Sequence, residues 1–481
     1  MVDMVRRERR CNSLNGESIR RGDARGARRR TSGAGTSGEC TSDRTKSHCE
    51  SMQHEEDGLP AGCSDSNQYF EDMAQLVSRF WWLINFKWTD IFLHDVVGKM
   101  PADWRRFLLS LGVKEIQDML FQMQAPDSAP LQFQKFVESC KNCALRLRWT
   151  LYTTPVPVNL KQNGFSDKKL RESLSLASYV SRLCEQRFPD FKNCLTLVDI
   201  GCGLGYVSSD LNKKGFHVVG VECRQHLVDS CNKRMKSDNL RFVQHRVDGS
   251  GESQQFLQSL VPDGRDGVLL GLHCCGDLLD HIIDLFIRSE RFSSLFCVTC
   301  CYHLIDKEGF PRSQACRSAC AKENLSFDHI SLRVGCQPTP WKWAHDLTHD
   351  SMLMYAKSST FRAVLEEALV QTDYRWKKPK CHMKKSLDFE NYVQQIIVGF
   401  DPQVRDIAER LLNETIQKRE CETHNVMALK ILQTIIQPVM ESLIVYDHVI
   451  KLREAGHSSF AVQAFSQLIS PRNTLIVSSK K

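Results

Sequence analysis

Two patterns of hydrophobic and polar positions follow one another along this chain. Between residues 69 and 149, apolar residues recur at intervals of three and four, as in YFEDMAQLVSRFWWLINF at 69–86. This is the period of helices that bury one face. We therefore predict a helical region over residues 69–165, followed by another helix at 167–186.

The pattern then changes to short apolar runs separated by helical stretches. The runs that we interpret as strands are residues 194–200, 217–222, 240–248, 267–273 and 294–300. Strands of this kind with helical crossovers are typical of a parallel sheet that is covered on both faces. The predicted fold class is therefore α/β, with a Rossmann-like sheet.

The remainder of the chain is predicted to be mostly helical before it returns to the sheet. Its most apolar stretch, 427–450, contains Lys430, Pro438, Glu441 and Asp447, so we interpret it as an amphipathic helix and expect no transmembrane segment. Residues 460–481 are predicted to form two strands around a turn at 470–473. The predicted organisation is a helical region 69–165, a sheet core 166–305, a helical insertion 306–440, and a closing helix and strands 441–481.

Composition changes this picture mainly at the start of the chain. Residues 1–68 are rich in Arg, Ser and Gly and almost free of large apolar residues, which predicts disorder. Residues 1–30 alone carry ten Arg against four acids, which is +6 of the net charge of +7. The rest is therefore close to neutral, and nothing in it indicates DNA specificity or a general nucleic-acid surface.

The 21 cysteines bear on the compartment. No apolar segment of the secretory type follows the basic start, so we expect reduced thiols inside the cell, in the cytoplasm or nucleus. An Arg- and Ser-rich start also occurs in mitochondrial transit peptides, but the acids in this one argue against that alternative.

The sharpest chemical signal is the stretch LVDIGCGLGYVSSDL at 197–211, where Gly201, Gly203 and Gly205 lie between a predicted strand and a predicted helix. Such glycines allow a tight turn and a close approach of the backbone to a ligand. The third glycine comes one position too early for the dinucleotide fingerprint, and Asp199 would repel a pyrophosphate. A carboxylate there suits a cationic ligand instead, such as the sulfonium and α-amino groups of S-adenosylmethionine.

Two further acids support this cofactor. Glu222 ends the second predicted strand, where a carboxylate can accept hydrogen bonds from both ribose hydroxyls. Asp248 ends the third, where an adenine amino group can donate to it. We therefore predict an S-adenosylmethionine site formed by Asp199, Gly201, Gly203, Gly205, Glu222 and Asp248.

Several motifs resemble the methyltransferase-like protein 25 family over residues 69–481. They are the glycine stretch, LGLHCCGDL at 270–278, CVTCCYHLI at 297–305 and SPRNTLIVSSK at 470–480. The resemblance implies a class I methyltransferase domain with additional helices, and naming within the family suggests RNA as a partner. Ribosomal adenine dimethylases carry an Asn-Leu-Pro-Tyr-type motif after the fourth strand. Residues 272–278 contain neither a proline nor a Phe, Tyr or Trp ring, so adenine N6 chemistry is not expected.

Candidate catalytic residues follow the fourth and fifth predicted strands, because ligands of open α/β sheets bind at the carboxyl ends of the strands. His273 or His303 can act as a general base for a ribose hydroxyl or another weak acid. Alternatively, a cysteine acts as a nucleophile, a layout that resembles cytosine-C5 RNA methyltransferases. The predicted catalytic set is His273, Cys300, Cys301, Tyr302 and His303.

The cysteines also allow a zinc interpretation. Cys297 and Cys300 precede Cys316 and Cys320 at nearly the spacing of a structural zinc site. Cys297 and Cys300 lie three apart on one predicted strand, so their side chains face opposite sides. We therefore predict no metal, and we interpret Cys297 as a buried, inert thiol.

Two classes of function stay open. One is a methyltransferase that acts on RNA, with protein or a small molecule as alternative acceptors. The other is an inactive methyltransferase fold that serves as an interaction platform. The stretch RWKKPKCHMKK at 375–385 has six Lys or Arg and a Trp that can stack on a base, although a solvated loop is the plainer interpretation. The sequence does not specify the acceptor atom or the oligomeric state.

Overall fold

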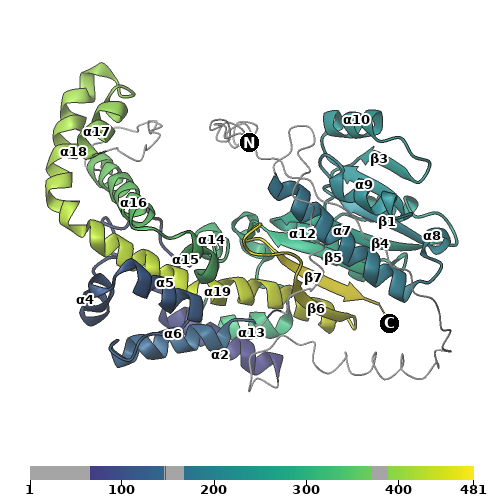
Figure 1. Ribbon diagram of the computed structural model, residues 1–481, viewed down its shortest axis with the longest axis horizontal. Coiled ribbons are helices and arrows are strands. Elements are labelled where there is room, and N and C mark those ends of the chain that lie inside the picture. Colours follow the sequence, from purple (N-terminus) through teal and green to yellow (C-terminus); the bar gives the residue numbers. More distant parts are fainter. Residues whose placement is uncertain (1–64, 146, 148–166, 371–387, 481) are drawn as a thin grey trace, which may run out of the picture. The chain divides into compact units, whose positions relative to one another are not determined.

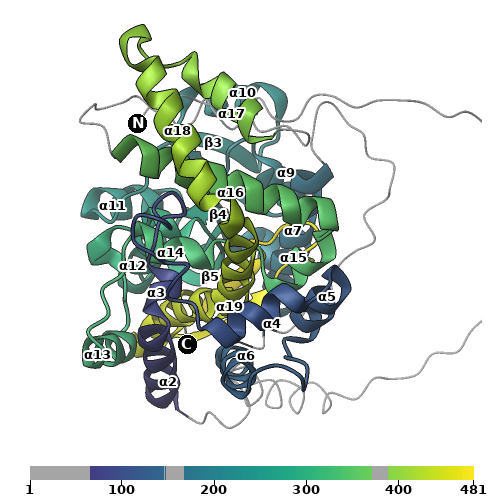
Figure 2. The ribbon, with the colours of Figure 1, turned by 90° about the vertical axis from the view of Figure 1, so that its left-hand side faces the viewer.

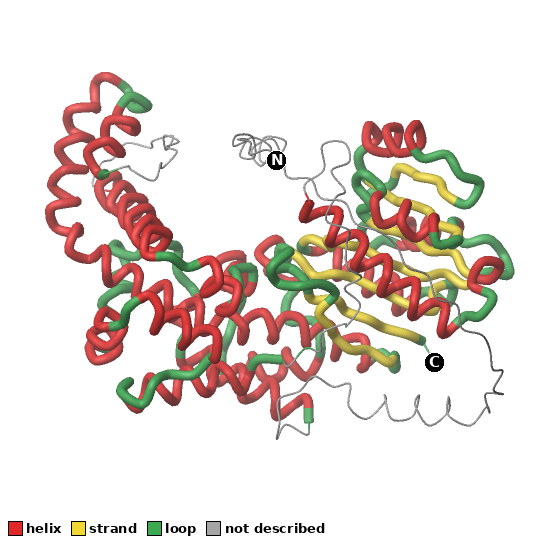
Figure 3. The backbone as a smooth tube through the Cα atoms, viewed as in Figure 1, coloured by secondary structure: helices red, strands yellow, loops and turns green. Residues whose placement is uncertain are grey.

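A seven-stranded sheet forms the centre of the α/β fold in the computed structural model, which describes residues 65–145, 147, 167–370 and 388–480. The strand order is β3-β2-β1-β4-β5-β7-β6 (Figures 1 and 3). The parallel strands are β1 (Leu195–Ile200), β2 (His217–Glu222), β3 (Leu240–Gln244), β4 (Asp266–Cys275) and β5 (Phe292–Cys300). The antiparallel strands are β6 (Ser458–Gln463) and β7 (Thr474–Ser479).

The predicted strands are confirmed in position, and one is shorter than expected. All six residues of β1 are buried, as an apolar run in a sheet covered on both faces should be. The third strand ends at Gln244 and not at Asp248. Asp248 instead accepts hydrogen bonds from the backbone N–H of Ser250 (3.1 Å) and the hydroxyl of Ser253 (2.8 Å). These bonds turn the chain into the next helix before the strand can extend further.

Helices pack on both faces of the sheet through two separate apolar clusters. One face is covered by α7 (Asp167–Arg187), α9 (Tyr206–Lys213) and α10 (Gln225–Arg234). The other is covered by α11 (Gly251–Ser259), α12 (Asp277–Arg288) and part of α19 (Thr423–Glu454). The short α8 (Phe191–Cys194) leads into β1. The two layers leave the carboxyl ends of the strands for chemistry.

Of the predicted N-terminal helical region 69–165, the described part is helical, and residues 148–165 lie outside the described residues. The described part comprises α2 (Ser66–Arg79), α3 (Trp81–Ile84), α4 (Ala102–Ser110), α5 (Val113–Gln122) and α6 (Leu131–Cys143). Helix α2 begins within the segment 1–68 that we expected to be disordered, and residues 1–64 lie outside the described residues.

The predicted helical insertion is also present. Its helices are α13 (Gln314–Lys322), α14 (His329–Gly335), α15 (Pro340–Asp346), α16 (His349–Val370), α17 (Phe389–Ile397) and α18 (Arg405–Arg419). The insertion also contains the 3-10 turns η2 (Lys307–Gly309), η3 (Pro402–Val404) and η4 (Glu420–Glu422). A further 3-10 turn, η1 (Tyr302–Leu304), lies just before the insertion. The basic stretch 375–385 lies outside the described residues.

Helix α19 corrects two expectations. It runs unbroken from Thr423 to Glu454, so the expected boundary at residue 440 falls inside one helix. It is also not amphipathic, because almost every residue from Val426 to Leu452 is buried. It contacts α2, α4 and α6 from the N-terminal region, α14 and α16 from the insertion, and α12 and β6 from the core (Figure 2). An amphipathic helix buries one face, whereas α19 is packed against other elements on all sides.

By length and hydropathy, one helical stretch of the described residues, 402–454, could cross a membrane. Its most apolar window is 89% buried within the fold, which is also the pattern of a core helix.

Buried polar side chains attach α19 to the sheet core. The Asp447 carboxylate is fully buried and accepts hydrogen bonds from the backbone N–H groups of Arg312 (2.6 Å) and Ser313 (2.8 Å). It also accepts one from the Ser313 hydroxyl at 2.6 Å. The next residue, His448, lies 2.9 Å from the Asp280 carboxylate on α12 through Nε2, and its Nδ1 lies 2.6 Å from the Ile444 carbonyl. Burial disfavours the charged imidazole, but the bond to Asp280 and that carboxylate's charge raise the pKa of His448 overall.

Substituting Asp447→Ala should destabilise the fold by about 2–4 kcal/mol, because two buried backbone donors lose their acceptor. Equilibrium urea unfolding of the full chain measures this free energy. The matched control is Asp401→Ala, because Asp401 is exposed and accepts only from the Gln403 N–H among its described bonds. Equal unfolding midpoints for the two variants would contradict the role assigned to Asp447.

Candidate functional site at the carboxyl ends of the strands

The glycine loop after β1 has the conformation that the sequence predicted. Gly201, Gly203 and Gly205 have φ angles of +70°, +57° and +71°, a region that side chains disfavour. At Gly205 an added Cβ would lie 2.6 Å from the Phe242 ring, so this glycine is needed for packing. At Gly203 the nearest heavy atom to an added Cβ is 3.9 Å away, so this side of the loop is open to a ligand. The loop is therefore a cradle that a side chain would fill.

Asp199 lies under this loop. Its side chain is 2% exposed and accepts a hydrogen bond from the Ser208 hydroxyl of α9 at 2.6 Å. Burial raises the pKa of Asp199 to about 7. A carboxyl group in this state gains most from a cationic partner. It therefore fits the α-amino end of S-adenosylmethionine and opposes a phosphate.

Glu222 links the loop to the end of β2. Its Oε2 accepts the Gly203 N–H at 3.1 Å, and its Oε1 accepts the backbone N–H and Nε of Arg224 at 3.1 and 2.9 Å. Burial raises the pKa of Glu222, but the hydrogen bond and charge of Arg224 outweigh it, so the pKa is lowered overall. Glu222 is therefore an anion at neutral pH, and Oε2 retains capacity for a hydroxyl donor.

Asp248 is placed differently from the other two acids. It lies four residues beyond the end of β3, is exposed, and precedes α11. Its bonds from Ser250 and Ser253 lower its pKa to about 2. The geometry shows Asp248 as an anion that shapes the start of α11, and its predicted contact with adenine remains a prediction.

His273 forms a pair that the sequence did not reveal. Its Nε2 lies 3.2 Å from Oε2 of Glu172, a buried residue in the first turns of α7. Burial raises the pKa of Glu172, but the hydrogen bond and charge of His273 lower it overall, so the carboxylate is ionised. A neutral His273 must then carry its proton on Nε2, which leaves Nδ1 able to accept one. Glu172 stands 101 residues before its partner in a plain helical pattern, so no sequence signal marks it.

Three thiols meet at the ends of β4 and β5. Cys275 and Cys300 are direct neighbours in the strand register, and Cys301 follows with a left-handed φ of +52°. The three Sγ atoms lie within 4.8 Å of one another, and those of Cys300 and Cys301 are 3.2 Å apart. Hydrogen bonds from Cys275 and Cys300 lower the pKa of Cys301, and burial opposes this. Cys274 and Cys297 are buried in the core instead.

The two residues after the thiols have different surroundings. Tyr302 was predicted to be a catalytic residue, but it is only 1% exposed and does not face the site. Its hydroxyl lies 2.8 Å from the Thr299 hydroxyl and donates to Glu441 of α19 at 3.2 Å. His303 is half-buried, its Nδ1 lies 3.4 Å from the Cys336 Sγ, and burial lowers its pKa. His303 is therefore neutral at pH 7 and can act as a base, whereas Tyr302 supports the turn from behind.

The zinc spacing noted in the sequence does not form one cluster. In the described part of the chain, the group of three or more potential metal ligands is Cys275, Cys300 and Cys301. Cys316 and Cys320 have their Sγ atoms 3.9 Å apart inside the helical core. Cys300 belongs to the strand-end group because β5 pairs with β4 there.

A cavity of about 420 Å³ lies on the insertion side and is lined in part by α14. It is lined by aromatic Trp88 and Tyr355 and by the cations Lys87, Arg333 and Arg362, with no carboxylate among its described lining residues. The 3-10 turn η1, which contains His303, packs on α14, which supplies Arg333 to this wall. The cavity therefore suits an anion with a flat ring.

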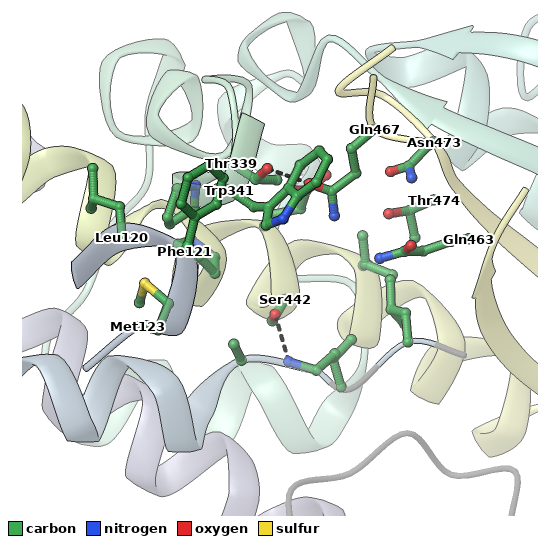
Figure 4. Close-up of a pocket in the computed structure, with 17 residues that line it drawn as sticks. Leu120, Phe121, Met123, Thr339, Trp341, Ser442, Gln463, Gln467, Asn473 and Thr474 are labelled. Atoms are coloured by element: carbon green, nitrogen blue, oxygen red, sulfur yellow. Dashed lines mark hydrogen bonds between the residues drawn. The ribbon is translucent and has the colours of Figure 1, made fainter. Parts of the chain in front are cut away.

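A second cavity, of about 220 Å³, lies behind the site between α5, α15, α19 and β7 (Figure 4). Trp341 and the amide side chains of Gln463, Gln467 and Asn473 line it. Figure 4 shows Thr339, which hydrogen-bonds Gln467, above Ser442 of α19. The lining contains none of the predicted cofactor or catalytic residues, so this cavity is separate from the site.

Substituting Gly203→Ala should weaken binding of S-adenosylhomocysteine at least tenfold, because the methyl group fills the open side of the loop. Isothermal titration calorimetry measures the affinity. Gly264→Ala is a matched control, because Gly264 also has a positive φ, of +78°, and open space around its Cβ. Both variants carry similar backbone strain of about 1–2 kcal/mol. Equal affinities in the two variants would place the ligand elsewhere.

The affinity for S-adenosylhomocysteine should rise with pH through about 7. The ligand's ammonium group favours ionised Asp199, whose pKa is about 7 in the free protein, so binding below that pH must release a proton. The loss approaches tenfold per pH unit below the pKa. Titrations between pH 5.5 and 8.5 in buffers of different ionisation enthalpy measure both effects. Asp199→Asn should bind weakly and without this pH dependence; a pH-dependent variant would exclude Asp199 as the source.

Comparison with known proteins agrees with this geometry. Residues 168–308 match the family described as Methyltransferase domain. The chain is 23% identical over 238 residues to "Probable methyltransferase-like protein 25" of Mus musculus and 23% identical over 252 residues to its Homo sapiens counterpart. In both cases the match covers 47% of this chain and 39% of the relative, so it spans about two fifths of each relative's length.

Solved structures are only remotely similar. The 23S rRNA methyltransferase ErmE is 13% identical, covers 31% of this chain and 52% of its own, and has a TM-score of 0.22. The plantazolicin methyltransferase BamL, in a complex that contains SAH, is 13% identical, covers 64% and 91%, and also has a TM-score of 0.22. Scores this low carry no conclusion about function.

The strand order, the glycine loop and the family match agree with one another, and the family resemblance expected from the motifs is confirmed. Residues 168–308 are therefore a methyltransferase domain of the Rossmann-like class, which implies S-adenosylmethionine as its cofactor, in a chain similar to methyltransferase-like protein 25.

Proposed function

We propose that this protein is an S-adenosylmethionine-dependent methyltransferase that acts on RNA. The observation that carries the proposal is that a cofactor-binding loop and a candidate general base lie at the same edge of one sheet. The glycine loop and the acids Asp199 and Glu222, which suit the cofactor, lie at the ends of β1 and β2, and His273 of the His273–Glu172 pair lies near the end of β4. Binding and proton transfer thus meet at the carboxyl ends of adjacent strands.

The residues at the end of β4 suit a proton acceptor. When bound, the cofactor supplies an activated methyl group, and a hydroxyl or ring N–H that takes it must lose a proton. The ionised Glu172 fixes the proton of His273 on Nε2 and directs Nδ1 as the base. This arrangement requires no charged thiol, so we favour general-base chemistry over the covalent cysteine route.

RNA is supported by the cavity that Arg333 of α14 lines, since α14 packs on the turn that contains His303. Trp88 and Tyr355 line this cavity in edge-to-face contact with each other, and Arg333 and Arg362 offer charge to phosphates. The neutral remainder of the chain argues against binding over a wide surface, so recognition is expected to concentrate here. A protein or small-molecule acceptor, or an inactive platform, remains the alternative that the experiments below distinguish.

The activity is tested by incubating the full chain with methyl-labelled S-adenosylmethionine and total cellular RNA, with total protein as a parallel acceptor. Label should enter RNA and be released by ribonuclease. Label in protein alone would replace RNA as the acceptor. Cofactor binding without labelling of RNA or protein would favour a small-molecule acceptor or the platform.

Substituting His273→Gln or Glu172→Gln should lower turnover at least a hundredfold at neutral pH, because the base or its orientation is lost. Binding of S-adenosylhomocysteine should stay within twofold of wild type. His345→Gln is the matched control, since His345 of α15 also lies near a carboxylate, Asp346 at 3.1 Å, but both side chains are exposed. Unchanged turnover in both test variants would remove His273 as the base.

Substituting Arg362→Gln should raise the KM for RNA roughly tenfold, equal to 1.4 kcal/mol, with turnover at saturation unchanged. Arg362 is exposed and lines the cavity. Arg410→Gln on α18 is the control, because Arg410 is also exposed and belongs to no described cavity wall. An identical KM in both variants would separate the cavity from RNA binding.

A further inference from the structure

The three thiols at the ends of β4 and β5 are not used by the proposed proton transfer. They lie together at the edge of the sheet where ligands bind, and they are partly accessible. We propose that Cys275, Cys300 and Cys301 bind a zinc ion. The proposal concerns this cluster alone and does not depend on which acceptor the enzyme methylates.

The fold brings the three sulfur atoms together by specific backbone features. The register pairs Cys275 with Cys300, so both side chains leave neighbouring strands at the same level. Gly276 then turns the chain with φ +55° and ψ −136°, a conformation essentially limited to glycine, and its N–H donates to the Cys300 carbonyl at 3.3 Å. A Cβ at Gly276 would meet Leu304 at 2.7 Å, so the turn is pressed against η1.

Cys301 completes the group through its own unusual conformation. Its φ of +52° and ψ of +48° are left-handed, which costs a residue with a side chain about 1–2 kcal/mol. In an extended continuation of β5 its side chain would face away from that of Cys300. The left-handed turn instead places its sulfur 3.2 Å from the Cys300 sulfur. The strained backbone conformation of Cys301 therefore brings a third thiol into the cluster.

The distances suit a thiolate-bound zinc ion. With Zn–S bonds of about 2.3 Å, tetrahedral geometry places sulfur atoms about 3.8 Å apart. The observed Sγ separations begin at 3.2 Å and remain within 4.8 Å, so small side-chain rotations reach that geometry. Binding replaces the thiol protons, which leave to solvent, and involves no oxidation or reduction.

The surrounding charge also suits such a site. Three thiolates around Zn²⁺ carry a net charge of −1. The largely buried guanidinium of Arg472 lies close enough to act electrostatically on both Cys300 and Cys301 and can balance it. Three protein ligands leave a fourth position for water or an acceptor atom, which is the composition of a catalytic and not a closed structural zinc site.

Metal analysis of the full chain tests the proposal. Protein purified in reductant is stripped with a chelator, titrated with ZnCl₂, desalted and measured by plasma mass spectrometry. We expect one zinc per wild-type chain, and Co²⁺ in its place should give thiolate-to-metal charge-transfer absorption. X-ray absorption on wild-type protein should count three sulfur ligands, and this measurement needs no variant.

The variants Cys300→Ser and Cys275→Ser should each lose the stoichiometric metal, while binding of S-adenosylhomocysteine reports whether they fold. The matched control, Cys421→Ser, removes an exposed thiol on η4 and should retain one zinc. Wild-type protein without zinc, or full zinc in Cys300→Ser, would overturn the proposal.

Discussion

The burial of α19 on all sides is the constraint on which the rest of the structure depends. A helix of this length in the core must find a partner for every polar side chain it carries, because an unpaired buried polar group costs about 1–3 kcal/mol. Gln433 donates to the Leu83 carbonyl, Gln437 donates to the Gly335 carbonyl, and Asp447 accepts from the turn before α13. These partners come from three separate stretches of the chain. The same bonds that satisfy the helix therefore fix the N-terminal helices and the insertion against the sheet.

This constraint reaches the candidate site through Glu441. Glu441 is buried in α19, accepts the Tyr302 hydroxyl at 3.2 Å and lies 3.5 Å from the Arg472 guanidinium. Arg472 also donates to the carbonyls of Gly335 and Gln337. The turn after β5, which carries the thiols and His303, is thus held from behind by a network in which every member has several bonds. A tyrosine that seemed a candidate for chemistry serves to position that turn.

The sheet was predictable because its signals are local. Buried parallel strands are continuous apolar runs, and a glycine loop between a strand and a helix has few alternatives, so β1 to β7 and the cofactor loop follow from sequence. Asp248 shows where prediction from local signals fails. The third strand was expected to reach Asp248, but the hydrogen bonds of its side chain with Ser250 and Ser253 turn the chain, and the strand ends earlier. Helix α19 was misjudged for a related reason. Lys430, Glu441 and Asp447 suggested a solvent face, whereas all three are buried. Their partners, Gln337, Tyr302 and Ser313, are distant in the sequence, so no local pattern can show them.

The part of the site that performs chemistry was predictable only in outline. Strand ends indicated His273 and the thiols, but the partner of His273 is Glu172, brought by a helix packed on the sheet face. The thiol cluster depends on strand register and on one left-handed residue, neither of which the sequence specifies.

The site divides its electrostatics between the two halves of the sheet. On the cofactor side, Glu222 is already satisfied by Arg224 and the glycine loop, while Asp199 carries a pKa near 7 in the free protein. Binding energy from a cationic ligand is therefore concentrated on Asp199, and Glu222 contributes shape and orientation. On the acceptor side, burial keeps His303 neutral, and ionised Glu172 fixes the tautomer of His273. Asp199 on the cofactor side thus binds a cationic ligand, and His273 on the acceptor side accepts a proton.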